Sequence, residues 1–309
     1  MGILSWLKRK KHKPTQVPQP VQPNGGSMPA KALLVGINSY PGYPLSGCVN
    51  DVANVANLLM QNYGFSQDQI CILRDRDATT ANILAKLEWL VSVNPGDRVL
   101  FWYSGHGAQY ATGGTGEPDG LSELMCPVDF DWSPQHMIID KQLVQIFSRI
   151  PQGVVFNWGS DSCHSGDLDR DLPPVSTDGL FGPLRKLWNM VFGPKVVQNK
   201  SKSYPAPDHV TTSVNLARAM NHAPKGMVNG ILDVGFVSGC QSNQTSADTN
   251  IGGQACGAMT WYFLKNLRTM AGSSLSDVVA ATSRDLAANG YSQRPQAEGA
   301  RKDKPFLLA

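Results

Sequence analysis

The sequence predicts an α/β protein, a three-layer α/β/α sandwich built on a mostly parallel sheet. Three observations lead to this fold class. Short apolar runs alternate with longer stretches in which apolar residues recur at helical spacing. The stretches between runs are long enough to hold the crossover helices that parallel strands require. The chain has 309 residues, of which 41% are apolar, so it can bury the core of a large domain.

Six strands are predicted from short apolar runs that polar or turn residues flank. The first, residues 32–37, is apolar throughout, as in a strand that is covered on both faces. The last is a short run close to the end of the chain. In chain order the predicted strands are residues 32–37, 69–73, 98–103, 154–158, 234–238 and 306–308.

The helices are predicted from apolar residues that share one face. In residues 51–63 this face carries Val52, Val55, Leu58 and Leu59. The helical spacing of residues 80–93 ends at an Asn-Pro-Gly sequence, which stops a helix. In chain order the predicted helices are residues 51–63, 80–93, 141–149, 258–267 and 275–289.

The composition divides the chain into a tail and a folded domain. Residues 1–30 are a basic tail and a Pro/Gln/Gly-rich linker, and the linker, residues 14–29, has too few apolar groups to pack. The folded domain is residues 31–309. Inside it, residues 167–230 interrupt the alternation of strands and helices, and they separate residues 31–166 from residues 231–309. An interruption of this length is either a surface insertion or a functional segment.

The tail holds most of the excess positive charge. Without its five basic residues the body has 22 basic and 24 acidic residues, which argues against a nucleic-acid partner. Residues 3–13 place apolar residues before basic ones, the reverse of a secretory signal. They are interpreted either as a disordered tail or as a contact with an anionic membrane surface.

The six cysteines contain no CxxC spacing, so a zinc site is not indicated. Reduced thiols are typical of the cytosol. No stretch of the sequence is long and apolar enough to span a membrane. The predicted location is the cytoplasm, with peripheral membrane contact as the alternative.

Two short strings point to nucleophilic chemistry. Tyr103-Ser104-Gly105-His106-Gly107 follows the third predicted strand, and Asp161-Ser162-Cys163-His164-Ser165-Gly166 follows the fourth. Ligands bind at the carboxyl ends of parallel strands, so His106 and Cys163 should meet at one edge of the sheet. An imidazole beside a thiol can take its proton and supply the thiolate nucleophile. The N–H groups of Gly107 and Cys163 could then face a developing oxyanion.

Each of these residues also has a simpler interpretation. His106 alone could be a surface histidine in a turn, and Cys163 alone could be a small buried hydrophobe. Their occurrence after successive strands favours a catalytic pair. His164 is adjacent to Cys163 in sequence, which makes it a poor base, so a structural role is predicted for it.

Beyond these strings, the chain resembles the caspase-like cysteine peptidases of the metacaspase kind (peptidase family C14), which include the bacterial orthocaspases. The resemblance covers about residue 31 to the end. It implies a caspase-like fold with a six-stranded sheet. It also implies that residues 31–166 are large-subunit-like, residues 231–309 small-subunit-like and residues 167–230 an insertion or processing linker. The further matching segments are residues 36–40, 45–51, 126–130, 238–247, 257–260 and 293–296.

The resemblance implies a dyad in which His106 is the base and Cys163 the nucleophile. It implies hydrolysis of peptide bonds after Arg or Lys through an acyl-enzyme. Asp51 and Asp161 lie beside the two site segments and suit a guanidinium or ammonium group. The family pattern adds Cys48 and Ser104 to the same substrate-binding pocket. The predicted pocket therefore consists of Cys48, Asp51, Ser104 and Asp161.

Simpler roles stay open for the four pocket residues. Asp51 could favour the dipole at a helix N-terminus, and Asp161 could cap a strand end. Ser104 could fill a turn, and Cys48 could be a packing residue.

No cofactor is required by this chemistry, and no metal ligands are assigned. Many metacaspases use calcium, which needs several oxygen ligands. Here Glu117, Asp119 and Glu123 supply some acids after the histidine, but Ile139 and Lys141 stand where relatives often carry Asp. These residues favour a peptidase that does not depend on calcium, and calcium binding is the alternative.

Residues 167–230 lie where family members are sometimes cut into two subunits, so self-processing is predicted, with a plain surface insertion as the alternative. A peptidase specific for basic residues could cut there after any of Arg170, Arg185, Lys186, Lys195, Lys200, Lys202, Arg218 and Lys225.

Other functions also stay open. They are a catalytically silent caspase-fold binding or scaffold protein, a gingipain- or clostripain-type peptidase and a membrane-attached adaptor. The intact dyad and pocket acids weigh against the silent protein. The expected partners are protein or peptide substrates with Arg or Lys at the cleaved position. The chain is expected to be a monomer, as metacaspases tend to be.

Overall fold

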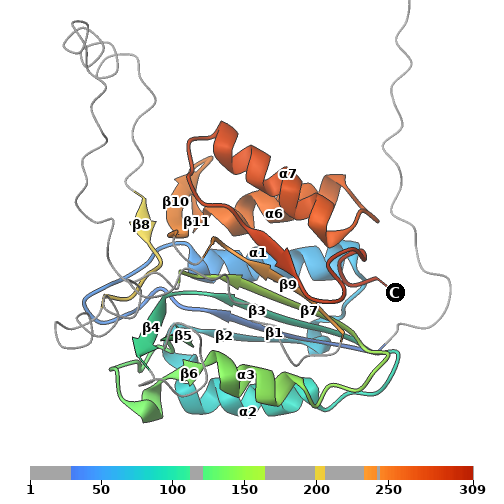
Figure 1. The fold of residues 1–309 in the computed structure, drawn as a ribbon, viewed down its shortest axis with the longest axis horizontal. Helices are drawn as coiled ribbons and strands as arrows, with labels where there is room; N and C mark the ends of the chain where they lie inside the picture. The colour runs from blue at the N-terminus through green and yellow to red at the C-terminus, as the bar shows by residue number, and fades with distance from the viewer. Residues whose placement is uncertain (1–28, 112–120, 164–198, 206–232, 242–243, 309) are drawn as a thin grey trace, which may run out of the picture.

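A six-stranded sheet runs through the centre of the molecule (Figure 1). The computed structural model describes residues 29–111, 121–163, 199–205, 233–241 and 244–308. The strand order is β12-β9-β7-β3-β1-β2, and all neighbours are parallel except β12, which is antiparallel to β9. The strands are β1 (Ala30–Gly36), β2 (Ile70–Arg74), β3 (Arg98–Ser104), β7 (Val155–Asp161), β9 (Val234–Ser238) and β12 (Gln296–Glu298).

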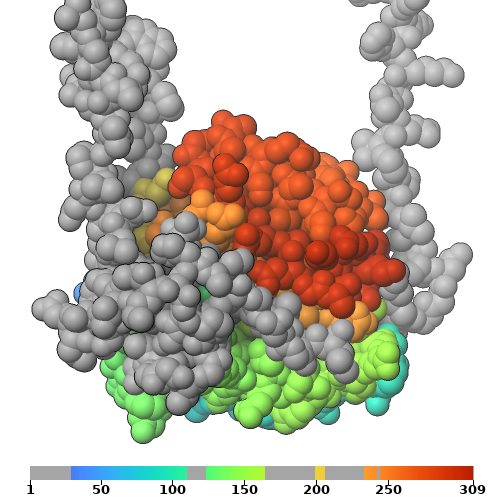
Figure 2. Space-filling model, in the orientation of Figure 1, coloured from blue at the N-terminus to red at the C-terminus, as the bar shows by residue number. Residues whose placement is uncertain are grey.

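Helices cover both faces of this sheet, so the predicted three-layer sandwich is confirmed. One face is covered by α1 (Cys48–Asn62), α6 (Ala258–Thr269) and α7 (Leu275–Ala288). The other is covered by α2 (Thr80–Val91) and α3 (Asp140–Phe147). In the space-filling view, the C-terminal layer and the α3 layer lie on opposite sides of one body (Figure 2).

The alternation of side chains along β3 explains why the sheet carries two cores. Val99, Phe101 and Tyr103 join the buried cluster under α2 and α3. Leu100 and Trp102 join the cluster under α1, α6 and α7. Successive side chains of a strand point to opposite faces, so an uninterrupted apolar run fits a strand that is covered on both sides.

Two helix starts follow from capping residues. The Thr79 side chain accepts from the Asn82 N–H at 3.3 Å, ahead of α2. The Ser274 side chain accepts from the Asp277 N–H at 3.1 Å, ahead of α7. Such caps satisfy backbone donors that have no partner inside the helix. None of the helices in the described ranges is both long enough and apolar enough for a membrane span.

The predicted strand at residues 306–308 is wrong, because the sixth strand is β12. Phe306 and Leu307 are buried, which accounts for their apolar character, but they lie in a turn. Leu307 has φ 52°, which no strand adopts, and its N–H donates to the Asn157 side chain at 2.9 Å. The true strand is short and polar at both ends, so it carries no apolar run that would reveal it.

Two small sheets were not predicted. One contains β4 (Gly107–Ala111), β5 (Leu121–Met125) and β6 (Ile138–Ile139). The other contains β11 (Gln254–Gly257), β10 (Ala247–Ile251) and β8 (Lys200–Ser201). A hairpin joins β10 to β11 through Gly252 and Gly253, with φ 62° and 86°, which glycine adopts without strain.

The predicted tail and linker, residues 1–30, and the predicted interruption, residues 167–230, lie mostly outside the described ranges. Residues 1–28 of the tail and linker are outside them. Of the stretch 167–230, residues 199–205 are described, and they include β8.

Candidate active site

The ends of β3 and β7 bring the two motif strings together. These strands are parallel neighbours, with Ser104 opposite Asp161. His106 and Cys163 each follow this pair by two residues. The Gly105 N–H donates to the Asp161 carbonyl at 3.4 Å, which continues the pairing past the strand end. Both residues therefore emerge at the same edge of the sheet.

Two tyrosines fix the main chain of His106. The His106 N–H donates to the Tyr40 hydroxyl at 3.0 Å, and the Tyr103 hydroxyl donates to the His106 carbonyl at 2.6 Å. The imidazole Nε2 lies 2.8 Å from the Tyr43 carbonyl oxygen. A carbonyl oxygen only accepts, so Nε2 carries the hydrogen of the neutral ring. Nδ1 is then the nitrogen that can take a proton.

The Cys163 thiol is buried against the residue that precedes β10. The Ser246 N–H donates to Cys163 Sγ at 2.5 Å, and Sγ lies 3.4 Å from the Ser246 carbonyl oxygen. The Ser246 hydroxyl donates to an Asp161 carboxylate oxygen at 2.5 Å. Ser246 therefore links the predicted nucleophile to the predicted pocket.

A lysine of the chain itself fills the predicted pocket. The Lys202 Nζ lies 2.9 Å from the Ser104 Oγ. The same atom lies 3.2 Å from the Asp51 Oδ2 and 3.1 Å from the Asp161 Oδ2. Lys202 is 0% exposed. A buried ammonium group is tolerated only when it is paired and hydrogen-bonded, and these three oxygens meet that need.

The electrostatics of the pocket favour a cation. Burial raises the pKa of Asp51 to about 6; Lys202 opposes this rise, and the Asp161 carboxylate adds to it. Burial lowers the pKa of Lys202, but its anionic neighbours, Asp161 first, more than offset this, so the net pKa lies well above its ordinary value. Burial likewise raises the pKa of the Cys48 thiol, against the effects of Lys202 and of a hydrogen bond with Ser104. Cys48 thus belongs to the same pocket.

The start of α6 supplies further donors to both carboxylates. The Gly257 N–H lies 2.8 and 3.0 Å from the two oxygens of Asp51. Asp161 accepts from the Thr260 N–H at 3.1 Å and from its hydroxyl at 2.7 Å. A Cβ at Gly257 would overlap both carboxylates and the Lys202 ammonium. The missing side chain at this position therefore makes room for the lysine.

The backbone around Lys202 lies in an extended form across the strand ends. β8 pairs antiparallel with β10, with Ser201 opposite Ala247. One residue later, the Lys202 N–H donates to the Ser246 carbonyl at 3.1 Å. Antiparallel pairing of this kind fixes the register of the segment against the site.

The Lys202 carbonyl oxygen completes the arrangement. It accepts from the Gly107 N–H at 2.9 Å and from the Cys163 N–H at 3.4 Å. These are the two groups that the sequence nominates as oxyanion donors. They converge on one carbonyl oxygen, and this carbonyl belongs to the residue whose side chain fills the acidic pocket.

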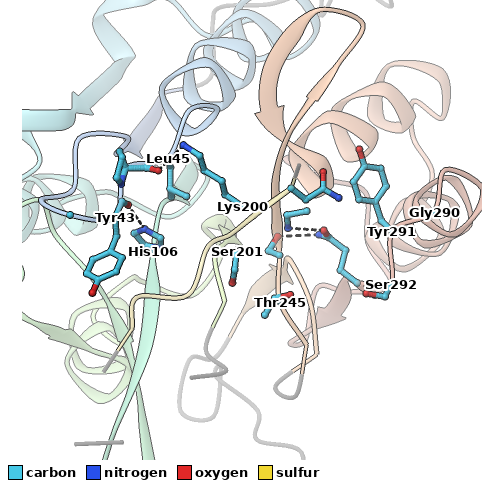
Figure 3. A pocket seen from close by; sticks show the side chains of 15 residues that line it. Tyr43, Leu45, His106, Lys200, Ser201, Thr245, Gly290, Tyr291 and Ser292 are labelled. Carbon is cyan, nitrogen blue, oxygen red and sulfur yellow. Dashed lines mark hydrogen bonds between the residues drawn. The ribbon is translucent and has the colours of Figure 1, made fainter. Parts of the chain in front are cut away.

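A cleft of about 570 Å³ continues from this point along β8. One of its sides carries Tyr43, Leu45 and His106, and the opposite side carries Tyr291 and Ser292 (Figure 3). β8 runs between these sides, and its residues are among those that line the cleft.

Several contributors to this site could not be recognised from the sequence. Ser246, Gly257 and Thr260 lie in matched C-terminal segments, but their spacing alone gives them no role. Lys202 is only one of the basic residues between 167 and 230. Tyr40 lies in a matched segment as well, and nothing local connects it to a histidine 66 residues later.

The acidic stretch that was considered for calcium is largely outside the described ranges, because Glu117 and Asp119 are not among them. Ile139 closes β6, and Lys141 lies in α3. Within the described residues, no cluster of three or more His, Cys, Asp or Glu side chains could hold a metal ion.

Comparisons with known proteins agree on the family. A family model described as "Metacaspase, peptidase C14 domain" matches residues 30–173. Metacaspase-1 of Saccharomyces cerevisiae is 35% identical over 301 residues, which cover 90% of this chain and 68% of the yeast protein. Metacaspase-1A of Aspergillus fumigatus is 35% identical over 283 residues, covering 86% of this chain and 67% of the relative. Metacaspase-1 of Debaryomyces hansenii is 34% identical, and this chain spans 63% of its length.

Solved structures share the fold. A crystal structure of a Geobacter sulfurreducens protein is 22% identical with a TM-score of 0.59, covering 91% of this chain and 99% of its own. Caspase-1 from Spodoptera frugiperda is 10% identical with a TM-score of 0.53, covering 91% and 93%. The sequence relatives, at 35% identity over most of the chain, give the family: the chain belongs to the metacaspase family of cysteine peptidases.

Proposed function

We propose that this chain is an endopeptidase that cleaves after Lys or Arg, with Cys163 as nucleophile and His106 as base, and that it cuts its own chain after Lys202. Its substrates are proteins, as the family implies. The observation that carries the proposal is the position of Lys202, whose side chain lies between the acids of the pocket while its carbonyl oxygen accepts from both oxyanion donors.

In this mechanism the first step forms an acyl-enzyme. His106 Nδ1 takes the thiol proton, and Cys163 Sγ attacks the carbonyl carbon of the basic residue. The C–O π electrons move to the oxygen, which becomes an oxyanion and accepts from the N–H groups of Gly107 and Cys163. When the intermediate collapses, the C–N bond breaks and His106 protonates the leaving amine.

The second step hydrolyses the thioester. His106 takes a proton from a water molecule, whose oxygen attacks the same carbonyl carbon. The C–S bond then breaks, Cys163 leaves as the thiolate and regains the proton from His106. The clamp on the His106 main chain by Tyr40 and Tyr103 serves both steps, because it holds the imidazole in one position.

A fluorogenic peptide panel tests the specificity. We expect substrates with Arg or Lys at the cleaved position to exceed the matched Asp substrate by at least about a thousandfold in kcat/KM, because an anion between two carboxylates is strongly disfavoured. The panel is measured with calcium and with a chelator, and equal rates are expected. Preference for Asp would refute the pocket assignment. No turnover of any substrate by the reduced protein would favour the scaffold alternative.

Self-processing is tested by substitutions at Lys202. The purified wild-type chain should yield a fragment that begins at Ser203, identified by N-terminal sequencing and mass spectrometry. Lys202→Arg should still be cut at this bond, and Lys202→Ala should lose this cut by at least about a hundredfold in rate, since the pocket acids are left unpaired.

The matched control is Lys200→Ala. Lys200 lies two residues away, and its Nζ contacts the Pro44 carbonyl at 3.0 Å outside the acidic pocket. This variant should still be cut after Lys202. A Cys163→Ala chain that nevertheless separates into the same two fragments would show that another protease makes the cut.

A further inference from the structure

Beyond the bond that follows Lys202, the chain stays attached to the site. Ser203 forms a parallel bridge with Gly107. The Tyr204 N–H donates to the Gly107 carbonyl at 2.9 Å. Residues on the leaving side of the bond are therefore held in register by Gly107, the first residue of β4, which also carries a proposed oxyanion donor.

The Tyr204 side chain fills a cage of aromatic rings. Its ring centroid lies 5.0 Å from Phe130, 5.2 Å from Tyr43, 6.0 Å from Tyr40 and 6.4 Å from Trp132. All four contacts are edge-on, which is a favourable arrangement for aromatic pairs. Tyr204 is only 8% exposed. We call these four residues the aromatic cage.

The cage is held by bonds that do not involve Tyr204. The Thr80 N–H and hydroxyl both lie 2.9 Å from the Asp129 carboxylate, which ties the segment of Phe130 to α2. The Tyr40 hydroxyl contacts the Cys126 carbonyl at 2.9 Å. Trp132 has φ 67°, a backbone conformation that a bulky residue adopts only when its surroundings impose it. The cage is thus a preformed feature of the surface next to the site.

The cage also adjoins the catalytic base. The Tyr204 ring meets the His106 ring edge-on, with centroids 5.5 Å apart. An aromatic residue in the cage therefore covers one side of the imidazole while the bond is cleaved. Since the cage consists of aromatic rings whose only polar groups are the tyrosine hydroxyls and the Trp132 indole N–H, a charged side chain would lose its hydration there. Burial likewise raises the pKa of the Tyr204 phenol.

We propose that the aromatic cage is a specificity subsite that selects an aromatic residue at the second position after the cleaved bond. This inference rests on the proposed function and extends it to the leaving side of the substrate. The preferred protein substrates then carry Lys or Arg, any residue, and Tyr or Phe. No hydrogen bond of the Tyr204 hydroxyl occurs among the described residues, so Phe should serve as well as Tyr.

The test uses quenched fluorescent peptides based on residues 199–205, with Ala in place of Lys200 so that one basic residue remains. The position of Tyr204 is Tyr, Phe, Ala or Asp. With the processed wild-type chain, we expect the kcat/KM of the Tyr and Phe peptides to exceed that of the Ala peptide by about tenfold. The difference from the Asp peptide should be larger. A coumarin substrate, which has no amino acid after the cleaved bond, is measured in parallel.

A variant of the cage provides the second measurement. Trp132→Ala should reduce the ratio of kcat/KM for the Tyr peptide to that for the Ala peptide to about twofold or less. Each value is normalised to the rate of the same variant on the coumarin substrate. Trp261→Ala is the matched control, because Trp261 is a partly buried tryptophan of α6 outside the cage, and its ratio should equal that of the wild type. In the full chain, Tyr204→Ala should slow self-processing and Tyr204→Phe should not.

The results can distinguish failure of the aromatic subsite from failure of the peptidase assignment. Equal kcat/KM for the Tyr and Ala peptides, with the coumarin substrate cleaved, overturns the subsite and leaves the peptidase assignment intact. An unchanged ratio in Trp132→Ala also overturns the subsite as built from the cage. If neither the coumarin substrate nor any peptide is cleaved by the reduced protein, the proposed function itself fails.

Discussion

Asp161→Asn should slow self-processing after Lys202 by roughly a thousandfold. Removal of one partner from a buried charge pair costs about 3–5 kcal/mol, and each increment of about 1.4 kcal/mol changes a rate tenfold. The amide has nearly the shape of the carboxylate, but it cannot neutralise the ammonium group 3.1 Å away. The substitution also replaces one of the two carboxylate oxygens that accept hydrogen bonds from the Ser246 and Thr260 hydroxyls. The rate is followed from the appearance of the fragment that begins at Ser203.

Glu88→Gln is the matched control for this substitution. Glu88 forms an ion pair with Arg149 at 2.7 Å, but both side chains are at least half exposed, so water and salt screen the pair and its loss should change little. Circular dichroism and thermal melting establish that each variant is folded. If Asp161→Asn is folded and processes itself at the wild-type rate, Asp161 does not recognise the basic residue.

Gly257→Ala should abolish cleavage after basic residues with a loss of at least about a hundredfold in kcat/KM. The added Cβ would overlap the space that the Lys202 ammonium and two carboxylate oxygens occupy, and a well-packed site accommodates an extra methyl group only with strain. The expected loss lies mainly in KM, since the thiol and the imidazole stay in place. It is measured by steady-state kinetics on the Arg substrate.

Gln254→Ala serves as the control at the other end of β11, where the side chain is exposed. It should retain wild-type kinetics. A Gly257→Ala enzyme with an unchanged KM for Arg and Lys substrates would mean that the cleaved residue binds elsewhere. A fall in kcat alone would indicate a displaced nucleophile rather than a filled pocket.

The fold could be predicted from sequence where one local pattern decides the structure. Residues 99–103 of β3 are all apolar, as a strand that is covered on both faces requires. The strand ends that carry His106 and Cys163 follow from the same alternation. The prediction failed at the last strand, because burial of Phe306 and Leu307 in a turn produces the same apolar run as a strand would.

The pocket was predictable only in part. Asp51 and Asp161 could be nominated because acids beside a cysteine and a histidine suggest a cationic substrate. Lys202 could not be distinguished from its basic neighbours, since its place depends on the pairing of β8 with a strand that begins at Ala247. Gly257 meets Asp51 across 206 residues of sequence. Contacts of such separation leave no signal in the spacing of either residue.

The placement of residues 199–205 across the strand ends has a kinetic consequence. A peptide that is tethered to its binding site competes at an effective concentration in the millimolar range, whatever the concentration of the protein in solution. Under the proposed function, a foreign protein at micromolar concentration would therefore be outcompeted until the tethered peptide departs. The first turnover would be unimolecular and insensitive to dilution, and attack on other proteins would begin after a lag that the chain itself sets.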